Sequence, residues 1–499
     1  MSPKAPVDND ELVGTKAASL TANQPTQTDG SVGAVGRNDT RFLGHPIGLA
    51  WLSAAEFWER FSYFGMQALL VLYMSEHLFK PEVAARVWLY EPFRRLIEMT
   101  YGPTTDAALP SITFGLYGGL VYVTPLAGGW LADRVLGRTW TVTLGGLLMA
   151  LGHFLMAFDV SFFVALICLL LGAGCFKGNL AGQIGDLYPP NDPRRPGAFQ
   201  VYFFGIQIAV ILSPFVCGTL GEVFGWHLGF GLAGIGMVIG LAIYLFGRAS
   251  LPPEPFRAAA SGTAKAPLTP DERRSVLILV ALLPVLALAL VGHQQVFNAY
   301  LIWAKRAYDF SLMGHQIPVT WLLSLNATMS ALLIAASAFL WRWYGRRRPE
   351  PEDLTKMIVG VIFCALAPVV LAAASAVQAM GGARIPLGWA IAFHFLGEIG
   401  FANLLPVGLA LYSRAAPQRL SGVMIAVYYL HMFLGTVLTG YLGTYVGALS
   451  DVKFWALHAG LIGIAAILLL FARVLIGKRL SSNSPGPVAQ PATSVPASG

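Results

Sequence analysis

The sequence has few charged residues: Asp, Glu, Lys and Arg make up 12% of its 499 positions, whereas 56% are hydrophobic. Soluble domains carry about 25% charged residues, so this chain has too few polar side chains to cover a water-soluble surface. Cysteine is also scarce, because only four are present and no pair has metal-ligand spacing. These shortages exclude a soluble enzyme, a disordered protein and a disulfide scaffold. They indicate a membrane protein whose outer surface faces lipid.

The N-terminus lacks the apolar run of a secretory signal peptide, because residues 1–40 are polar and rich in Ser, Thr, Asn, Asp and Gly. We expect residues 1–42 to form a disordered cytoplasmic tail. The Ser-, Pro- and Ala-rich residues 480–499 predict a second disordered cytoplasmic tail.

Long apolar runs fill the rest of the chain, and a helix that crosses a membrane needs about 20 apolar residues. Proline, glycine and charged residues divide the runs into twelve expected spans, at 46–79, 111–133, 138–158, 161–188, 197–220, 226–248, 275–305, 316–343, 355–380, 386–414, 419–447 and 453–477. Residues 80–110 carry charges of both signs and predict an extramembrane loop. The sequence therefore predicts an all-α membrane protein with twelve transmembrane helices.

The connection at residues 249–274 contains five prolines, which predicts an extended and mobile linker. It divides the spans into an N-terminal six-helix bundle, 43–248, and a C-terminal six-helix bundle, 275–479. Two such bundles are typical of transporters with a central site at the bundle interface. The count alone does not exclude a channel or a membrane enzyme.

Basic residues are unevenly distributed between the expected loops. With both termini inside, the expected cytoplasmic segments hold most of the Lys and Arg residues. This bias predicts a multi-pass protein of the cell (inner) membrane with both termini cytoplasmic. It also accounts for the net charge of +7 without a nucleic-acid-binding surface.

Charged residues inside the spans are costly and indicate function. Five lie well inside the apolar spans, namely Glu56, Glu59, Arg60, Lys177 and Glu398. The alternative is that internal ion pairs only hold the helices together. Both readings require the charges to face the protein interior or water rather than lipid.

The first span carries a polar stripe at helical spacing, formed by Glu56, Glu59, Arg60, Tyr63 and Gln67. If Arg60 pairs with one of the two glutamates, the other competes for the basic residue of the fourth span. A carboxylate without a partner takes up a proton in a low-dielectric environment. The stripe therefore predicts a coupled proton site.

His293 is a further candidate for proton coupling, since it lies mid-span among Gln294, Gln295 and Asn298. The alternative is a hydrogen-bonded structural histidine. Other polar or aromatic span residues either bridge helices or line a site, and these are Asn179, Gln183, Gln207, Asn326, Trp321, Tyr428 and Tyr429.

Residues 129–138, with the sequence GWLADRVLGR, lie in the expected turn between the second and third spans. They resemble the loop signature G-x-L-A-D-R-x-x-G-R of the major facilitator superfamily. The resemblance implies the major facilitator fold. It also implies a conformational latch formed by Asp133, Arg134 and Arg138, which steadies the outward-facing state.

Residues 56–65, with the sequence EFWERFSYFG, resemble the E-x-x-E-R-F-x-Y-Y-G signature of the proton-dependent oligopeptide transporter (POT) family. The resemblance continues in both bundles, at 172–179, 199–207, 225–230, 397–398 and 406–409. It implies a proton-coupled transporter in which Lys177 helps to hold a peptide carboxylate and Glu398 holds the amino group.

The resemblance also carries roles to Glu56, Glu59, Arg60, Tyr63, Tyr202 and Asn326, whereas His293, Gln294 and Asn298 are candidates from their own place in the seventh span. Proton coupling is expected of Glu56, Glu59, Arg60, Lys177 and His293. Substrate contacts are expected of Tyr63, Gln67, Lys177, Tyr202, Gln207, Gln294, Asn298, Asn326, Glu398 and Tyr428.

Six residues depart from the family pattern: Phe64 replaces a tyrosine, Gln67 a second basic residue, Gly178 a proline, Gln207 an asparagine, His293 a carboxylate and Tyr428 a tryptophan. The connection between the bundles also has no room for the two extra helices of many bacterial members. These differences bear on peptide specificity and leave the proton-coupling motif intact.

We therefore expect a proton-coupled symporter of di- and tripeptides or peptide-like compounds, working by alternating access as a monomer in the lipid bilayer. One alternative is a proton-coupled transporter of another amphipathic metabolite or anion. A second is a transport-inactive membrane receptor. An enzyme is not expected, and neither a cofactor nor a metal is expected.

Overall fold

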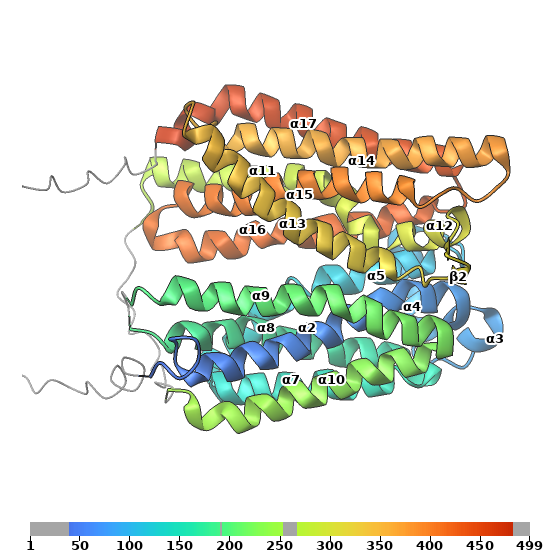
Figure 1. The fold of residues 1–499 in the computed structure, drawn as a ribbon, viewed down its shortest axis with the longest axis horizontal. Coiled ribbons are helices and arrows are strands. Elements are labelled where there is room, and N and C mark those ends of the chain that lie inside the picture. Colours follow the sequence, from blue (N-terminus) through green and yellow to red (C-terminus); the bar gives the residue numbers. More distant parts are fainter. Residues whose placement is uncertain (1–38, 190–191, 253–266, 483–499) are drawn as a thin grey trace, which may run out of the picture.

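The computed structural model describes residues 39–189, 192–252 and 267–482. Most of the expected N-terminal tail, the middle of the expected linker and residues 483–499 of the expected C-terminal tail lie outside the described residues. Figure 1 shows a long molecule built almost entirely of helices that run along one axis.

The first half of the chain folds into these elements: α2 (Ile47–Tyr73), η1 (Met74–Leu78), α3 (Pro81–Ala84), α4 (Tyr90–Tyr101), α5 (Leu109–Leu120), α6 (Thr124–Leu131), η2 (Ala132–Leu136), α7 (Arg138–Leu155), η3 (Asp159–Ser161), α8 (Phe162–Asp186), α9 (Arg195–Ser213), η4 (Pro214–Gly218), η5 (Leu220–Phe224), α10 (Trp226–Gly247) and η6 (Arg248–Ser250). We call this set of helices the first bundle.

The second half contains α11 (Pro270–Gln294), η7 (Gln295–Phe297), α12 (Ala299–Ala307), β1 (Ser311–Leu312), β2 (His315–Gln316), α13 (Trp321–Gly345), α14 (Asp353–Gly381), α15 (Gly388–Ala415), η8 (Gln418–Leu420), α16 (Ser421–Leu442), η9 (Gly443–Tyr445) and α17 (Asp451–Ser482). We call these helices the second bundle. The strands β1 and β2 form one antiparallel hairpin.

The helices confirm the twelve expected spans. Within the described residues, ten are long and apolar enough to cross a membrane by length and composition. The other two carry more polar residues: α2 contains Glu56, Glu59 and Arg60, and α7 begins at Arg138. The expected loop at 80–110 contains the short helices α3 and α4, and the latter is amphipathic.

Two expected spans are interrupted. The span expected at 111–133 breaks between α5 and α6. The span expected at 275–305 ends its long helix at Gln294 and restarts after Asn298. The start of α11 is well defined, because Thr269 and Glu272 form a capping box there and Pro270 occupies the first turn.

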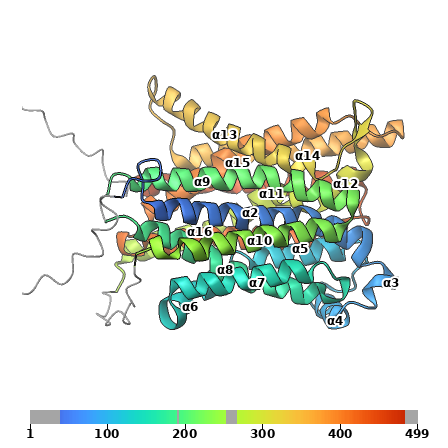
Figure 2. The same ribbon diagram turned by 60° about the horizontal axis from the view of Figure 1, so that its bottom comes forward.

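All spanning helices alternate in direction, so the described chain ends lie at one end of the molecule (Figures 1 and 2). We call this the terminal end and the opposite one the far end. At the far end α5 touches α16 so closely that a Cβ added to Gly115 would lie 2.4 Å from the Cα of Gly440. Small residues permit such close approach of membrane helices.

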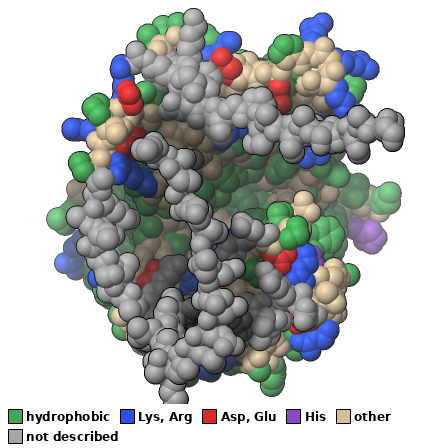
Figure 3. Space-filling model, turned by 90° about the vertical axis from the view of Figure 1, so that its left-hand side faces the viewer, with side chains coloured by type: hydrophobic (Ala, Val, Ile, Leu, Met, Phe, Trp, Pro, Cys, Tyr) green, Lys and Arg blue, Asp and Glu red, His purple; other side chains and the backbone are tan. Residues whose placement is uncertain are grey.

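Polar contacts also join the bundles near the far end. The Glu222 carboxylate accepts hydrogen bonds from the Thr320 backbone N–H at 2.9 Å and its hydroxyl at 2.7 Å. Lys305 Nζ lies 2.6 Å from Glu76 Oε1. Figure 3, which views the terminal end, shows a hollow with hydrophobic side chains between the bundles. The bundles are therefore closed against each other at the far end and parted at the terminal end.

Candidate functional site

An ion cluster lies on α2, where Arg60 contacts both glutamates of the motif. Arg60 Nε lies 2.6 Å from Oε1 of Glu56 and 3.0 Å from Oε2 of Glu59. Both glutamates are fully buried, so their charges depend on this shared cation. Arg60 thus contacts both carboxylates at once, because the i, i+3, i+4 spacing brings both within reach of one guanidinium.

Lys177 reaches the same region from α8. Its Nζ lies 3.9 Å from the ring centroid of Tyr63, the geometry of a cation–π contact. Among the described residues no salt bridge joins Lys177 to Glu56 or Glu59. The lysine is half-buried and is held by an aromatic face beside the ion cluster.

Other residues around the cluster come from three helices. Tyr202 of α9 is buried beside Glu56, and Tyr117 of α5 is buried near Glu59. Gln67, one helical turn beyond Tyr63, is buried with its Oε1 lacking a hydrogen-bond partner. Sequence reasoning missed Tyr117, because α5 carries no charged residue that would mark this face of the helix. Gln207 is half-buried on α9.

A second titratable pair lies in the other bundle. His293 Nδ1 of α11 lies 3.2 Å from Oε1 of Glu398 of α15, and the histidine ring stacks on Phe401 with centroids 4.0 Å apart. Glu398 is 1% exposed, and its Oε2 has no hydrogen-bond partner. The second carboxylate oxygen is thus available for another donor.

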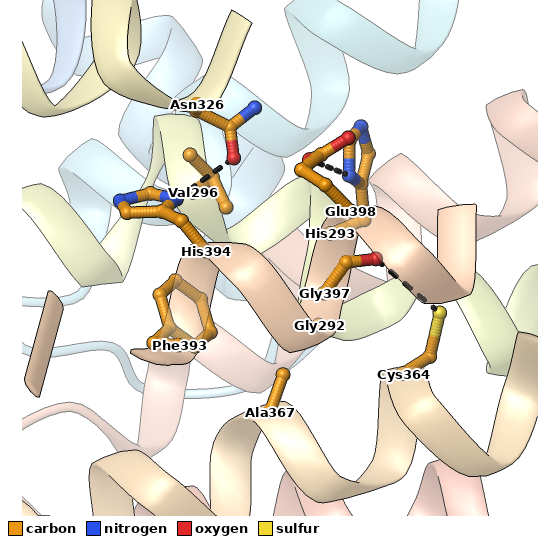
Figure 4. Close-up of a pocket in the computed structure, with 10 residues that line it drawn as sticks. All are labelled: Gly292, His293, Val296, Asn326, Cys364, Ala367, Phe393, His394, Gly397 and Glu398. Carbon is orange, nitrogen blue, oxygen red and sulfur yellow. Dashed lines mark hydrogen bonds and ion pairs between the residues drawn. The ribbon is translucent and has the colours of Figure 1, made fainter. Parts of the chain in front are cut away.

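Figure 4 shows the pocket beside this pair, with a cavity of about 10 Å³. That is close to the smallest space that holds one water molecule. On its other side His394 Nδ1 lies 2.8 Å from Oδ1 of Asn326, and His394 Nε2 lies 3.1 Å from the Tyr300 hydroxyl. His394 was missed, although it stands four residues before Glu398 and so shares its face of α15.

The remaining candidates of the second bundle do not all reach this pocket. Gln294 donates a hydrogen bond to Thr436 of α16, and Asn298 is fully buried with neither side-chain polar atom partnered. Tyr428 packs inside the bundle, where its hydroxyl donates to the Leu405 carbonyl at 2.8 Å. The structure thus does not bring Tyr428 to the pocket.

The expected latch residues lie at the terminal end. Asp133 and Arg134 are exposed, and Arg138 pairs with Asp186 at the end of α8. Within the described ranges Asp133 forms no salt bridge. This matches the parted bundles at the terminal end, because a latch across them requires contact.

Twelve spanning helices in two bundles, with a buried ion cluster in the first bundle and a buried His–Glu contact in the second, define a membrane transporter of the major facilitator fold. Comparison with known proteins then identifies the family. The model of the POT family matches residues 139–255 and 259–455, so the chain belongs to the POT family. The expectation from the sequence motifs is confirmed.

The chain is similar to named relatives over nearly its whole length. A peptide transporter of Yersinia enterocolitica subsp. palearctica serotype O:3 (strain YE-P4) is 28% identical, over 89% of this chain and 97% of the relative. A di-/tripeptide transporter of Lactococcus lactis subsp. lactis (strain IL1403) is 26% identical, over 88% of this chain and 97% of the relative.

Solved structures show the same arrangement of helices. A crystal structure of a POT peptide transporter in complex with sulfate superposes with a TM-score of 0.76 at 26% identity, covering 90% of this chain and 98% of that chain. A mutant POT peptide transporter in complex with alafosfalin gives a TM-score of 0.75 at 26% identity, covering 89% and 97%.

Proposed function

We propose that the protein is a proton-coupled symporter of short peptides or peptide-like compounds that works by alternating access. The observation that carries this proposal is the division of charge between the bundles. Lys177 lies beside the ion cluster of the first bundle, and Glu398 is buried in the second. A zwitterionic peptide needs a cation for its carboxylate and an anion for its ammonium group, and the two bundles offer one of each.

Charge balance at the ion cluster explains how a proton assists binding. Two carboxylates, Glu56 and Glu59, face two cations, Arg60 and Lys177, so their formal charges cancel. Protonation of one glutamate leaves an excess positive charge, which a peptide carboxylate neutralises. Buried uncompensated charge is costly, so the proton and the peptide carboxylate favour each other's binding.

In the second bundle, one partner of Glu398 can be exchanged for another. A protonated His293 and a peptide ammonium group compete for the same carboxylate. Binding of the ammonium group displaces His293 from Glu398, so the imidazole loses its partner. His293 therefore couples recognition of the amino group to the protonation state of the pocket.

The names of the relatives support the substrate class. The Yersinia relative is named a peptide transporter and the Lactococcus relative a di-/tripeptide transporter, and alafosfalin occupies one similar POT structure. We place the terminal end in the cytoplasm of the inner membrane, in keeping with the basic loops. The described state is then inward-open, with Asp133, Arg134 and Arg138 acting as the latch when the terminal end closes.

Proton-driven uptake in proteoliposomes tests this function. A dipeptide should accumulate when the outside is acidified, and Lys177→Ala should abolish that accumulation. Lys453→Ala is the matched control, because this lysine lies near the start of α17 outside the site and its removal should leave uptake unchanged. Full proton-driven uptake by Lys177→Ala would contradict the mechanism.

A second candidate is proton-coupled transport of another amphipathic metabolite or anion. It is favoured by Gln67, which supplies no positive charge for a carboxylate, and by His293 beside Glu398. A thermal-shift screen separates the two, because a ligand that binds only the folded protein raises its melting temperature. Stabilisation by non-peptide ligands and none by dipeptides would favour the second candidate. If no ligand drives proton flux, the protein is instead a transport-inactive receptor.

A further inference from the structure

Three potential metal ligands meet at the far end of the first bundle, outside the ion cluster and the pocket. They are His77 of η1, Asp159 of η3 and His227 at the start of α10. His77 Nε2 lies 2.9 Å from Asp159 Oδ2, and His227 Nε2 lies 3.5 Å from Asp159 Oδ1. The three ligand atoms all lie within 4.8 Å of one another, so a single ion can contact all three after small side-chain adjustments.

The surroundings of these side chains orient them as ligands. His227 Nδ1 lies 3.4 Å from the carbonyl oxygen of Met156, which favours a proton on Nδ1 and leaves the lone pair on Nε2. The Tyr73 hydroxyl donates to Asp159 Oδ1 at 2.5 Å. Metal-binding histidines and carboxylates are held by partners of this kind, which fix their tautomer and direction.

A metal site also needs a path by which the ion can enter, and the exposure of these three side chains provides one. The side chains of His77, Asp159 and His227 are 34%, 26% and 42% exposed. They are therefore open to solvent on one side and anchored on the other. A three-ligand site of this kind leaves a coordination position for water.

We propose that His77, Asp159 and His227 bind one divalent transition-metal ion, with Zn²⁺ as the best match. Two imidazole nitrogens and one carboxylate oxygen suit Zn²⁺, Co²⁺ or Ni²⁺, whereas Mg²⁺ and Ca²⁺ prefer all-oxygen sites. Sequence reasoning expected no metal, because it searched for closely spaced ligands. Asp159 comes 82 positions after His77 in the chain, and His227 comes later still. Only the fold brings the three together.

The site adjoins the contact that closes the far end. Glu76, next to His77, pairs with Lys305 of the second bundle at 2.6 Å, and Lys305 Nζ lies 5.7 Å from the ring centroid of Trp226, next to His227. An ion bound to both His77 and His227 therefore holds in place Glu76 and Trp226, the first-bundle residues that contact Lys305.

Calorimetric titration of the full-length protein with Zn²⁺ tests the proposal. The protein should carry an affinity tag without histidine and should first be stripped with a chelator. We expect one Zn²⁺ per chain. His77→Gln and His227→Gln should each weaken binding by at least tenfold, and Tyr73→Phe, which removes a supporting hydrogen bond, by about tenfold. His315→Gln, in the exposed β1–β2 hairpin, is the matched control and should bind as the unaltered protein does.

Two further measurements extend the test, and the second of them needs no variant. Zn²⁺ should raise the melting temperature of the unaltered protein and leave that of His227→Gln unchanged. Co²⁺ added to the stripped, unaltered protein should give the visible absorption of a tetrahedral nitrogen–oxygen site. Absence of stoichiometric Zn²⁺ binding, or equal binding by His77→Gln and His227→Gln, would show that the three side chains form only a hydrogen-bonded cluster and would overturn the proposal.

Discussion

His293 Nδ1 lies 3.2 Å from Oε1 of Glu398, so the carboxylate that is expected to read a substrate amino group already faces a titratable partner. The two residues come from α11 and α15, and the ring of the histidine is held flat against Phe401. A substrate amino group that binds Glu398 must therefore displace the imidazole of His293. This relationship distinguishes the pocket from one built of a carboxylate alone.

Replacing His293 tests its part in coupling. In His293→Gln the neutral amide keeps a hydrogen-bond donor near Glu398 but cannot take up a proton. We expect dipeptide binding to become less sensitive to pH between about 5 and 8, where histidine ordinarily titrates. Binding measured by calorimetry across this range checks the expectation. An unchanged pH profile would remove His293 from the coupling path, whereas His315→Gln should leave the profile unaltered.

Arg60→Lys tests the shared ion cluster. Lysine keeps the charge but lacks the planar guanidinium that faces Glu56 and Glu59 together. One lost charge-assisted hydrogen bond costs about 1.5–3 kcal/mol, so proton-driven uptake should fall by about tenfold or more. The control is Arg342→Lys near the end of α13. Normal uptake by Arg60→Lys would show that charge alone, without the fork geometry, maintains the cluster.

Gly115→Ala tests the close contact of α5 with α16. The added Cβ would lie 2.4 Å from the Cα of Gly440, so the helices must move apart at the far end. Spin labels on Met99→Cys and Met313→Cys, both exposed at the far end, should report a longer distance in this variant. Gly231→Ala in α10 is the control, since its Cβ would meet no atom within 4 Å. An unchanged distance in Gly115→Ala would mean that this contact does not set far-end closure.

The loop before α9 gives a prediction about pH and stability. The Arg194 side chain and backbone N–H donate to Asp192, and this lowers the pKa of the Asp192 carboxyl. Arg194 also donates to the Asp39 carbonyl, which ties this loop to the chain before α2. A lowered pKa in the folded state means that the pair stabilises the fold above the unfolded carboxyl value of about 3.9 and ceases to do so as the pH falls below it.

We therefore expect Asp192→Asn to melt at a lower temperature than the unaltered protein at pH 7. The difference should shrink towards zero as the pH falls below about 4, because protonation removes the same charge. Melting curves recorded at several pH values measure this difference in melting temperature. The control is Glu91→Gln, which alters an exposed residue. A difference that stays constant with pH would assign the effect to something other than the carboxylate charge.

The sequence predicted much of the fold because lipid imposes simple rules on it. Apolar runs bounded by proline, glycine and charge gave twelve spans that match the helices within a few residues. The break at Asn298 was not predicted, because residues 299–305 after it remain mostly apolar and continue the expected span. The bounds of the two bundles as separate domains stay a prediction.

The site was predicted in part, wherever residues lay on one helix. Glu56, Glu59 and Arg60 follow helical spacing, so their cluster could be expected, although the sharing of Arg60 could not. Contacts between helices depend on packing that no single segment encodes. The meeting of His394 with Asn326 and the three-residue group at the far end are of this kind.

Coupled flux is the most direct test of proton-driven peptide symport. Dipeptide uptake and proton entry should be recorded together in proteoliposomes containing the unaltered protein and Glu59→Gln. With the unaltered protein, adding dipeptide should start proton entry that rises with peptide uptake. In Glu59→Gln, peptide exchange should persist while peptide-driven proton entry is lost. Peptide uptake without proton entry in the unaltered protein, or unchanged proton entry in Glu59→Gln, would contradict the proposed coupling.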